Sequence, residues 1–223
     1  MKRLLVAVLV GLVAAAGVRA HFAFILPEAD GNAAKVVFSD ELAPDAAVNI
    51  EKLANTKLTL RDAAGKDSPL EWKKGEGFYL VNLPGGGPRV VYGVTEYGVL
   101  QKGDTHPFRL TYYPKALIGD VPAAKAVVGG PLVVEIVPSG GAGTTRFQVL
   151  HQGKAAADVE ATVLVPGGEK KAVKTDKGGF TPEFAPSGRY GVTARVTDAK
   201  AGEYAGKAFA ESRHYATLVV DVK

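Results

Sequence analysis

The chain has 223 residues, with 27 lysine and arginine residues against 23 acidic ones, and it contains no cysteine. Without cysteine the protein forms no disulfide and offers no thiolate to a metal, and a single methionine, Met1, excludes a methionine-rich Cu(I) site. Lys2, Arg3 and Arg19 all lie near the N-terminus, and the remaining 24 basic side chains nearly balance the 23 acidic ones, which argues against nucleic acid as a partner.

The first 20 residues have the pattern of a secretory signal peptide. Lys2 and Arg3 precede an apolar run that extends from Leu4 to Val18, and small residues at Val18 and Ala20 form a signal-peptidase site. The run is too short and too rich in alanine and glycine for a stable membrane span. Cleavage after Ala20 would place the protein in the periplasm or outside the cell, with His21 as its first residue.

Glycine and proline punctuate short runs rich in valine, leucine, tyrosine and threonine, which is the pattern of an all-β protein. The predicted strands are, in chain order, Phe22 to Leu26, Lys35 to Ser39, Ala47 to Glu51, Lys57 to Arg61, Phe78 to Asn82, Arg89 to Thr95, Phe108 to Tyr113, Leu132 to Val137, Arg146 to His151, Glu160 to Val165, Ala172 to Thr175, Tyr190 to Val196 and His214 to Val222. A weak helical pattern follows Pro122, over residues 123–128.

The glycine-rich stretch at residues 138–143 is the expected joint between two domains. We expect an N-terminal β-rich domain over residues 21–138 and a second domain over residues 139–223, both β-sandwiches of immunoglobulin-like or prealbumin-like type. The turns of the second domain, such as Thr175-Asp176-Lys177-Gly178-Gly179, make it resemble the prealbumin-like or carboxypeptidase-regulatory sandwich. Its last strand is expected to pair back to the N-terminal strand.

Four histidines, His21, His106, His151 and His214, are the available imidazole ligands. At a free N-terminus, His21 would offer both its amine and a ring nitrogen to one metal ion, and such nitrogen ligands suit copper or nickel. If the first and last strands are neighbours, the ring of His214 completes a three-nitrogen histidine brace. Alternation along the last strand also allows His214 to be a hydrogen-bonded core residue.

The other two histidines carry weaker signals. His106 lies in the polar loop Gln101 to Pro107, where it is either a third ligand or a solvated side chain. His151 ends a predicted strand and is expected to be exposed. The sequence contains no glycine-rich phosphate loop, no nucleophile elbow and no zinc-protease helix motif, so hydrolase chemistry has no support.

Several segments together carry a family resemblance, namely His21 to Pro27 directly after the signal, Tyr97 to Val99, Tyr112 to Ala116, Gly188 to Tyr190, Gly202-Glu203 and His214 to Leu218. The chain resembles an uncharacterised exported domain family related to the periplasmic components of cobalt and nickel uptake systems. The resemblance implies a β-rich periplasmic protein that binds a transition metal, with His21 as the anchor and His214 as a further ligand.

Three hypotheses follow. The leading one is a periplasmic or secreted protein that binds Cu(II), with Ni(II) or Co(II) as alternatives, and serves metal handling or uptake, with a membrane transporter component as its partner. The second is a copper-dependent oxidative enzyme of the histidine-brace type. The third is a structural β-sandwich module in which His21 has no role. The single tryptophan, Trp72, offers no aromatic-rich carbohydrate surface and favours binding over catalysis.

Overall fold

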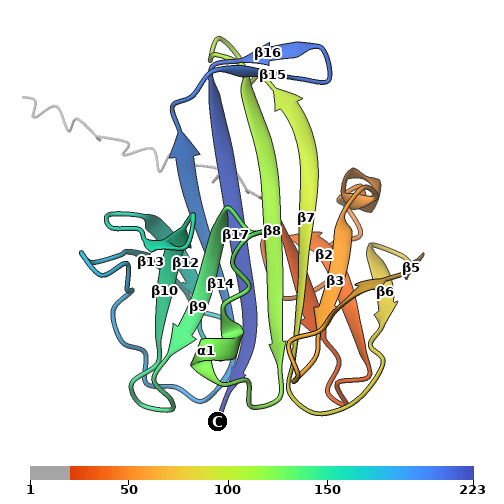
Figure 1. The fold of residues 1–223 in the computed structure, drawn as a ribbon, viewed down its shortest axis with the longest axis vertical. Coiled ribbons are helices and arrows are strands. Elements are labelled where there is room, and N and C mark those ends of the chain that lie inside the picture. Colours follow the sequence, from red (N-terminus) through yellow and green to blue (C-terminus); the bar gives the residue numbers. More distant parts are fainter. Residues whose placement is uncertain (1–20) are drawn as a thin grey trace, which may run out of the picture.

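The computed structural model describes residues 21–223, which are built almost entirely of strands (Figure 1). The described residues include one α-helix, α1 (Ala123–Ala126), and one 3-10 helix, η1 (Ile50–Leu53). The mostly-β prediction is confirmed. The predicted signal peptide lies outside the described residues. Within residues 21–223, no helix has the length and apolar character needed to cross a membrane.

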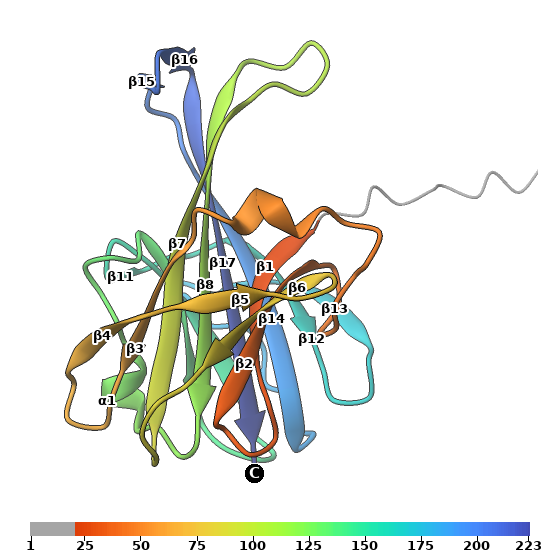
Figure 2. The same cartoon turned by 90° about the vertical axis from the view of Figure 1, so that its right-hand side faces the viewer.

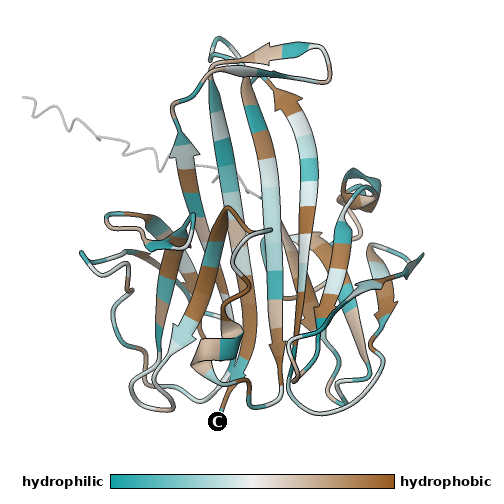
Figure 3. Cartoon of the chain, in the orientation of Figure 1, coloured by the Kyte–Doolittle hydropathy of each residue, from teal (hydrophilic) through white to brown (hydrophobic). Residues whose placement is uncertain are grey.

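A large mixed sheet of eight strands forms the middle of the molecule (Figure 1). Its spatial order is β13 (Lys170–Lys174), β12 (Glu160–Leu164), β14 (Gly188–Asp198), β17 (Glu211–Val222), β8 (Phe108–Ile118), β7 (Arg89–Leu100), β3 (Lys57–Arg61) and β4 (Asp67–Leu70). Neighbouring strands are antiparallel except β17 and β8, which run parallel. Apolar and polar residues are interspersed along the long strands (Figure 3), and β8 and β17 are buried at successive positions where a layer covers each face of the sheet, so both faces contribute to a core.

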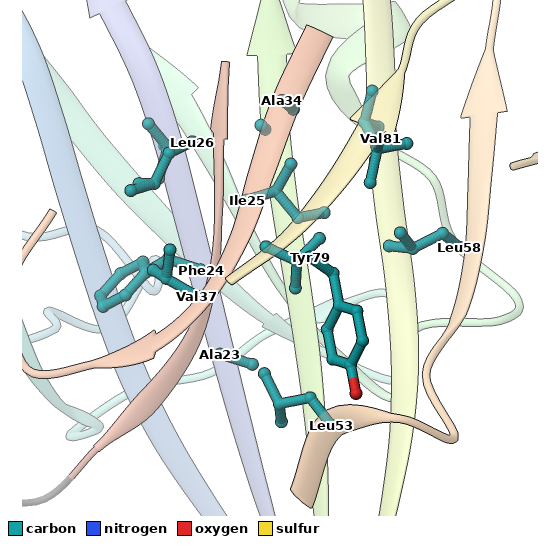
Figure 4. Packing of buried hydrophobic residues seen from close by; sticks show 14 of the residues in the cluster. Ala23, Phe24, Ile25, Leu26, Ala34, Val37, Leu53, Leu58, Tyr79 and Val81 are labelled. Atoms are coloured by element: carbon teal, nitrogen blue, oxygen red, sulfur yellow. The ribbon is translucent and has the colours of Figure 1, made fainter. Parts of the chain in front are cut away.

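A smaller sheet covers one face of the large sheet (Figure 2). Its order is β1 (Phe22–Pro27), β2 (Ala33–Ser39), β6 (Phe78–Asn82) and β5 (Trp72–Lys74). The core between these two sheets includes Ala23, Phe24 and Ile25 of β1, which pack against residues such as Leu53 and Tyr79 (Figure 4). We call this the β1 face of the large sheet.

A second layer covers the opposite face, which we call the β9 face. It consists of β9 (Val134–Ser139), β10 (Arg146–His151) and β11 (Lys154–Ala155), together with α1. The hairpin of β15 (Gly202–Tyr204) and β16 (Lys207–Phe209) lies at the upper end of the long strands (Figure 1). Because alternate residues of a strand point to opposite faces, Tyr112 belongs to the core of the β1 face and Tyr113 to that of the β9 face.

The N-terminal strand is held against the large sheet by side chains as well as by packing. Three of its backbone carbonyls accept hydrogen bonds from side chains of the large sheet. The Tyr112 hydroxyl donates to the carbonyl of His21 (3.4 Å), the Thr217 hydroxyl to that of Ala23 (2.7 Å), and the Arg189 guanidinium to that of Pro27 (2.9 Å). Residues 23–27 are buried. The start of the described chain therefore has a defined position.

The expected pairing of the first and last strands is wrong. β17 forms its ladders with β14 and β8, and β1 forms its ladder with β2. The two strands instead lie in different sheets and touch across the core, where Thr217 donates to Ala23. The predicted boundary at residues 138 and 139 separates strands that share the large sheet, since β8 and β17 are direct neighbours.

Candidate functional site

His21 lies at the beginning of β1, beside the loop that follows β2. Its ring packs against Phe38, with ring centroids 5.8 Å apart. Its Nε2 atom lies 3.5 Å from Oδ2 of Asp45, and both side chains are 26% exposed. The Tyr112 hydroxyl contacts the backbone carbonyl of His21. Side chains from three segments thus surround this residue, and part of its ring reaches solvent.

This arrangement assigns different roles to the two ring nitrogens. The Asp45 carboxylate faces Nε2 and favours the tautomer that carries its hydrogen there. Nδ1 is then the unprotonated nitrogen, and it is the one that can close a chelate ring with the amine of the same residue. A carboxylate on the outer nitrogen of a histidine is a common way to orient a metal ligand and raise its basicity.

Aromatic rings surround the His21 region on the β1 face. Tyr112 contacts Phe38, Tyr97 and Tyr215 through its ring, with centroid separations of 5.6 Å in each case. Burial raises the pKa of the Tyr112 hydroxyl well above its usual range, and the neighbouring Tyr97 and Tyr215 add to this rise. The phenol next to His21 therefore stays neutral and acts as a hydrogen-bond donor.

His214 does not join His21. The His21 ring lies on the β1 face with Phe38 and Tyr112, whereas the His214 ring stacks on Tyr113 on the β9 face. The large sheet thus separates the two imidazoles, and the predicted brace of His21 with His214 is not assembled. The physical reason is the two-residue period of β17: Tyr215, not His214, points towards β1.

His214 instead belongs to a polar cluster formed with His151, Asp198 and Tyr113. Its Nδ1 lies 3.0 Å from the Tyr113 hydroxyl, and its Nε2 lies 3.4 Å from Oδ2 of Asp198. Nε2 of His151 lies 3.3 Å from the other Asp198 oxygen. Burial lowers the pKa of His214 below its ordinary value, although the Asp198 carboxylate opposes that shift.

Sequence reasoning missed this cluster. His151 was expected to be exposed in a separate domain, but its ring centroid lies 6.4 Å from that of His214. Asp198 had no role assigned. The structure explains the contact: Val196 is the antiparallel partner of His214, so Asp198, two residues further along β14, points to the same face. The sequence carried no signal for this pairing.

His106 is remote from both groups. It lies in the exposed loop between β7 and β8, at the upper end of the molecule (Figure 2). The register partner of His214 on β8 is Thr111, so five residues, or about 16 Å of extended chain, separate His106 from that position. The structure does not bring His106 to either His21 or His214.

In residues 21–223, no three histidine, aspartate or glutamate side chains are grouped so that they could hold a metal ion. Comparison with known protein families and with curated proteins gives no match to this chain.

Proposed function

We propose that the chain is exported, is cut after Ala20, and binds Cu(II) through the amine and Nδ1 of His21. Amine and imidazole nitrogens suit Cu(II), which has the highest affinity of the divalent first-row ions for such ligands. Ni(II) and Co(II) are the alternatives. The proposed role is metal handling or uptake, with a membrane transporter component as the partner.

One observation carries the proposal: the Nε2 side of His21 faces Asp45, which leaves Nδ1 for a chelate with the amine. The hydrogen bond from Tyr112 to the His21 carbonyl and the burial of the next residues hold this chelate in place. A preorganised pair of ligands loses less conformational freedom when the metal binds than a mobile terminus would.

The first test compares protein that begins at His21 with protein that carries one additional glycine ahead of it. The extra residue converts the terminal amine into an amide, so we expect the processed form to bind one Cu(II) tightly and the extended form to bind it far more weakly. Calorimetry gives the affinity, and electron paramagnetic resonance reports nitrogen ligands. Equal Cu(II) affinity in the two forms would show that the terminal amine is not a ligand and would overturn the proposed chelate.

A second test addresses Asp45. The Asp45→Asn variant keeps the size of the side chain but removes its charge, and loss of such an outer partner costs about 10- to 100-fold in metal affinity. His214→Ala is the matched control, since His214 lies on the other face of the large sheet and its loss leaves Cu(II) affinity unchanged. Weaker Cu(II) binding by His214→Ala together with normal Cu(II) binding by Asp45→Asn would contradict the assignment of the metal site to His21 and Asp45.

We also propose that the chain is related to the exported domain family of cobalt and nickel uptake systems, and that its two layers belong to two β-sandwich modules. The packing of one smaller layer on each face of the large sheet is compatible with immunoglobulin-like or prealbumin-like modules.

A further inference from the structure

The polar cluster on the β9 face connects two layers of the molecule. His151 is the last residue of β10, in the layer of β9, β10 and β11, whereas Asp198 ends β14 and His214 belongs to β17 of the large sheet. Among the described residues, two ion pairs join this layer to the large sheet. One is Lys115 with Glu135 in the core, and the other is His151 with Asp198. The second pair therefore holds the end of β10 against the sheet.

The contacts of His214 define where its hydrogen lies at neutral pH. Burial raises the pKa of the Tyr113 hydroxyl well above its usual range, so this phenol keeps its proton and donates it to Nδ1 of His214 (3.0 Å). The ring hydrogen is then on Nε2, which faces Asp198 at 3.4 Å. His214 is thus neutral, with a partner on each ring nitrogen, and its side chain is 11% exposed.

Few other charges surround the two imidazoles. Arg109 of β8 pairs with Glu96 of β7 at 2.8 Å, so the charges of these two side chains largely cancel. Lys154 of β11 is the register partner of His151 and adds a positive charge at the end of the layer. Among the described residues, the Asp198 carboxylate is the one anion that both imidazoles contact.

One carboxylate balances one added proton but not two. A proton on either imidazole forms an ion pair with Asp198, which lies 3.3 Å from His151 and 3.4 Å from His214. A second proton gives the cluster a net positive charge, and the two rings, with centroids 6.4 Å apart, then repel each other. Since His214 is buried, water screens this repulsion poorly. Proton uptake by the two histidines is therefore coupled.

We propose that this cluster is a pH-sensitive latch, which holds the end of β10 on the large sheet while at most one imidazole is charged and releases it when both are charged. The movement is limited to the end of the layer. Phe147 and Val149, earlier on β10, are fully buried in the core, and the pair of Lys115 and Glu135 stays in place. The latch lies on the face of the sheet opposite His21, so it does not depend on the copper proposal.

Amide hydrogen exchange in metal-free protein of residues 21–223 tests the latch. The Gln152 amide, which donates to the Val133 carbonyl (2.7 Å), reports on the end of β10, and the Thr181 amide, which donates to Phe147 (2.9 Å), reports on its beginning. After correction for intrinsic exchange, protection of Gln152 should fall about tenfold between about pH 8 and about pH 5, because the open state binds protons more tightly. Protection of Thr181 should not change.

Matched variants identify the groups responsible. His214→Gln keeps a hydrogen-bonding side chain but cannot take up the second proton, so Gln152 should keep its protection down to about pH 5. His106→Gln is the control, since His106 lies in the exposed loop before β8, and it should behave like the unaltered protein. Asp198→Asn removes the shared anion and should increase the loss of Gln152 protection.

Three outcomes would overturn the latch. The first is an equal loss of Gln152 protection in His214→Gln and in the unaltered protein. The second is a parallel loss at Gln152 and Thr181, which indicates opening of the whole layer. The third is full protection of Gln152 in the unaltered protein down to about pH 5. If His214→Gln does not fold, Asp198→Asn decides, and a loss no larger than that of the unaltered protein would overturn the latch.

Discussion

At the scale of single residues, the two histidines expected to act together have opposite environments. His21 lies at the end of a strand, with its ring partly exposed and a carboxylate on one nitrogen. His214 is 9% exposed and has partners on both nitrogens, the Tyr113 hydroxyl and Asp198. The His21 ring thus remains accessible to solvent, whereas His214 completes an internal hydrogen-bond network.

The depressed pKa of His214 predicts a pH dependence of stability. Its folded pKa lies below the ordinary 6.5, so the unfolded chain takes up a proton first as the pH falls. The free energy of unfolding should therefore decrease as the pH falls from about 6.5 through the folded pKa. Urea unfolding at a series of pH values measures this, and the His214→Gln variant should show a flatter curve over that range.

A buried ion pair between Lys115 and Glu135 gives a second prediction at this scale. Their side chains lie 2.6 Å apart and are 1% and 3% exposed, and the backbone amides of Val128 and Gly129 also donate to Glu135. Burial lowers the pKa of Lys115 to about 8, and the nearby carboxylate opposes that shift.

Replacement of one partner leaves the other charge buried. Lys115→Met should lower the free energy of unfolding by about 3–5 kcal/mol, because the Glu135 carboxylate then lacks its cation. Lys171→Met, in an exposed pair, is the control and should change stability by less than about 1 kcal/mol. Similar losses in both variants would argue against the buried pair as the cause.

At the scale of elements, the N-terminal strand connects the two sheets that enclose the first core. It pairs with β2 in the small sheet and accepts side-chain hydrogen bonds from three strands of the large one, β8, β14 and β17. Thr217 makes the shortest of these bonds, and its side chain is 1% exposed. The position of His21 thus depends on residues nearly 200 positions later in the sequence.

Thr217→Val tests this connection. The substitution preserves shape but leaves the Ala23 carbonyl without its buried donor, which should cost about 1–3 kcal/mol of stability. Thr197→Val, at an exposed position on β14, should be nearly neutral. Denaturant unfolding measures both variants, and no difference between them would show that packing alone holds the strand.

At the scale of the whole molecule, the two predicted domains are joined through one sheet. β8, from the first half, and β17, from the second, are parallel neighbours along nine paired positions. Each half therefore leaves an unpaired strand edge and part of an uncovered core when it is separated from the other.

A fragment of residues 21–138 should consequently fail to fold by itself, while protein that begins at His21 should unfold in a single cooperative transition. Amide dispersion in the nuclear magnetic resonance spectrum of the fragment checks the first expectation, and calorimetry of the longer protein checks the second. A dispersed fragment spectrum would establish an independent first domain.

Much of the strand pattern could be predicted because alternation and turn residues are local signals. Predictions at Lys57 to Arg61 and Phe78 to Asn82 match the observed strands. The end placed at Tyr113 was wrong, because β8 continues through Pro114 to Ile118. Pro114 lies at an interruption of the β7–β8 ladder, between the pairs Tyr92–Lys115 and Thr95–Tyr112, where its missing N–H costs no ladder bond. Lys115 finds a buried carboxylate in Glu135. Neither feature is visible in the local sequence.

The sequence by itself determined that the chain is mostly β and which residues alternate along each strand, because these depend on neighbours close in the chain. Only the tertiary structure decided which histidines meet. His214 faces His151 and Asp198 rather than His21, because pairing of β17 with β8 and β14 sets which of its faces turns towards β1. Strand neighbours are chosen by long-range packing, and a shift of one residue in register exchanges the two faces.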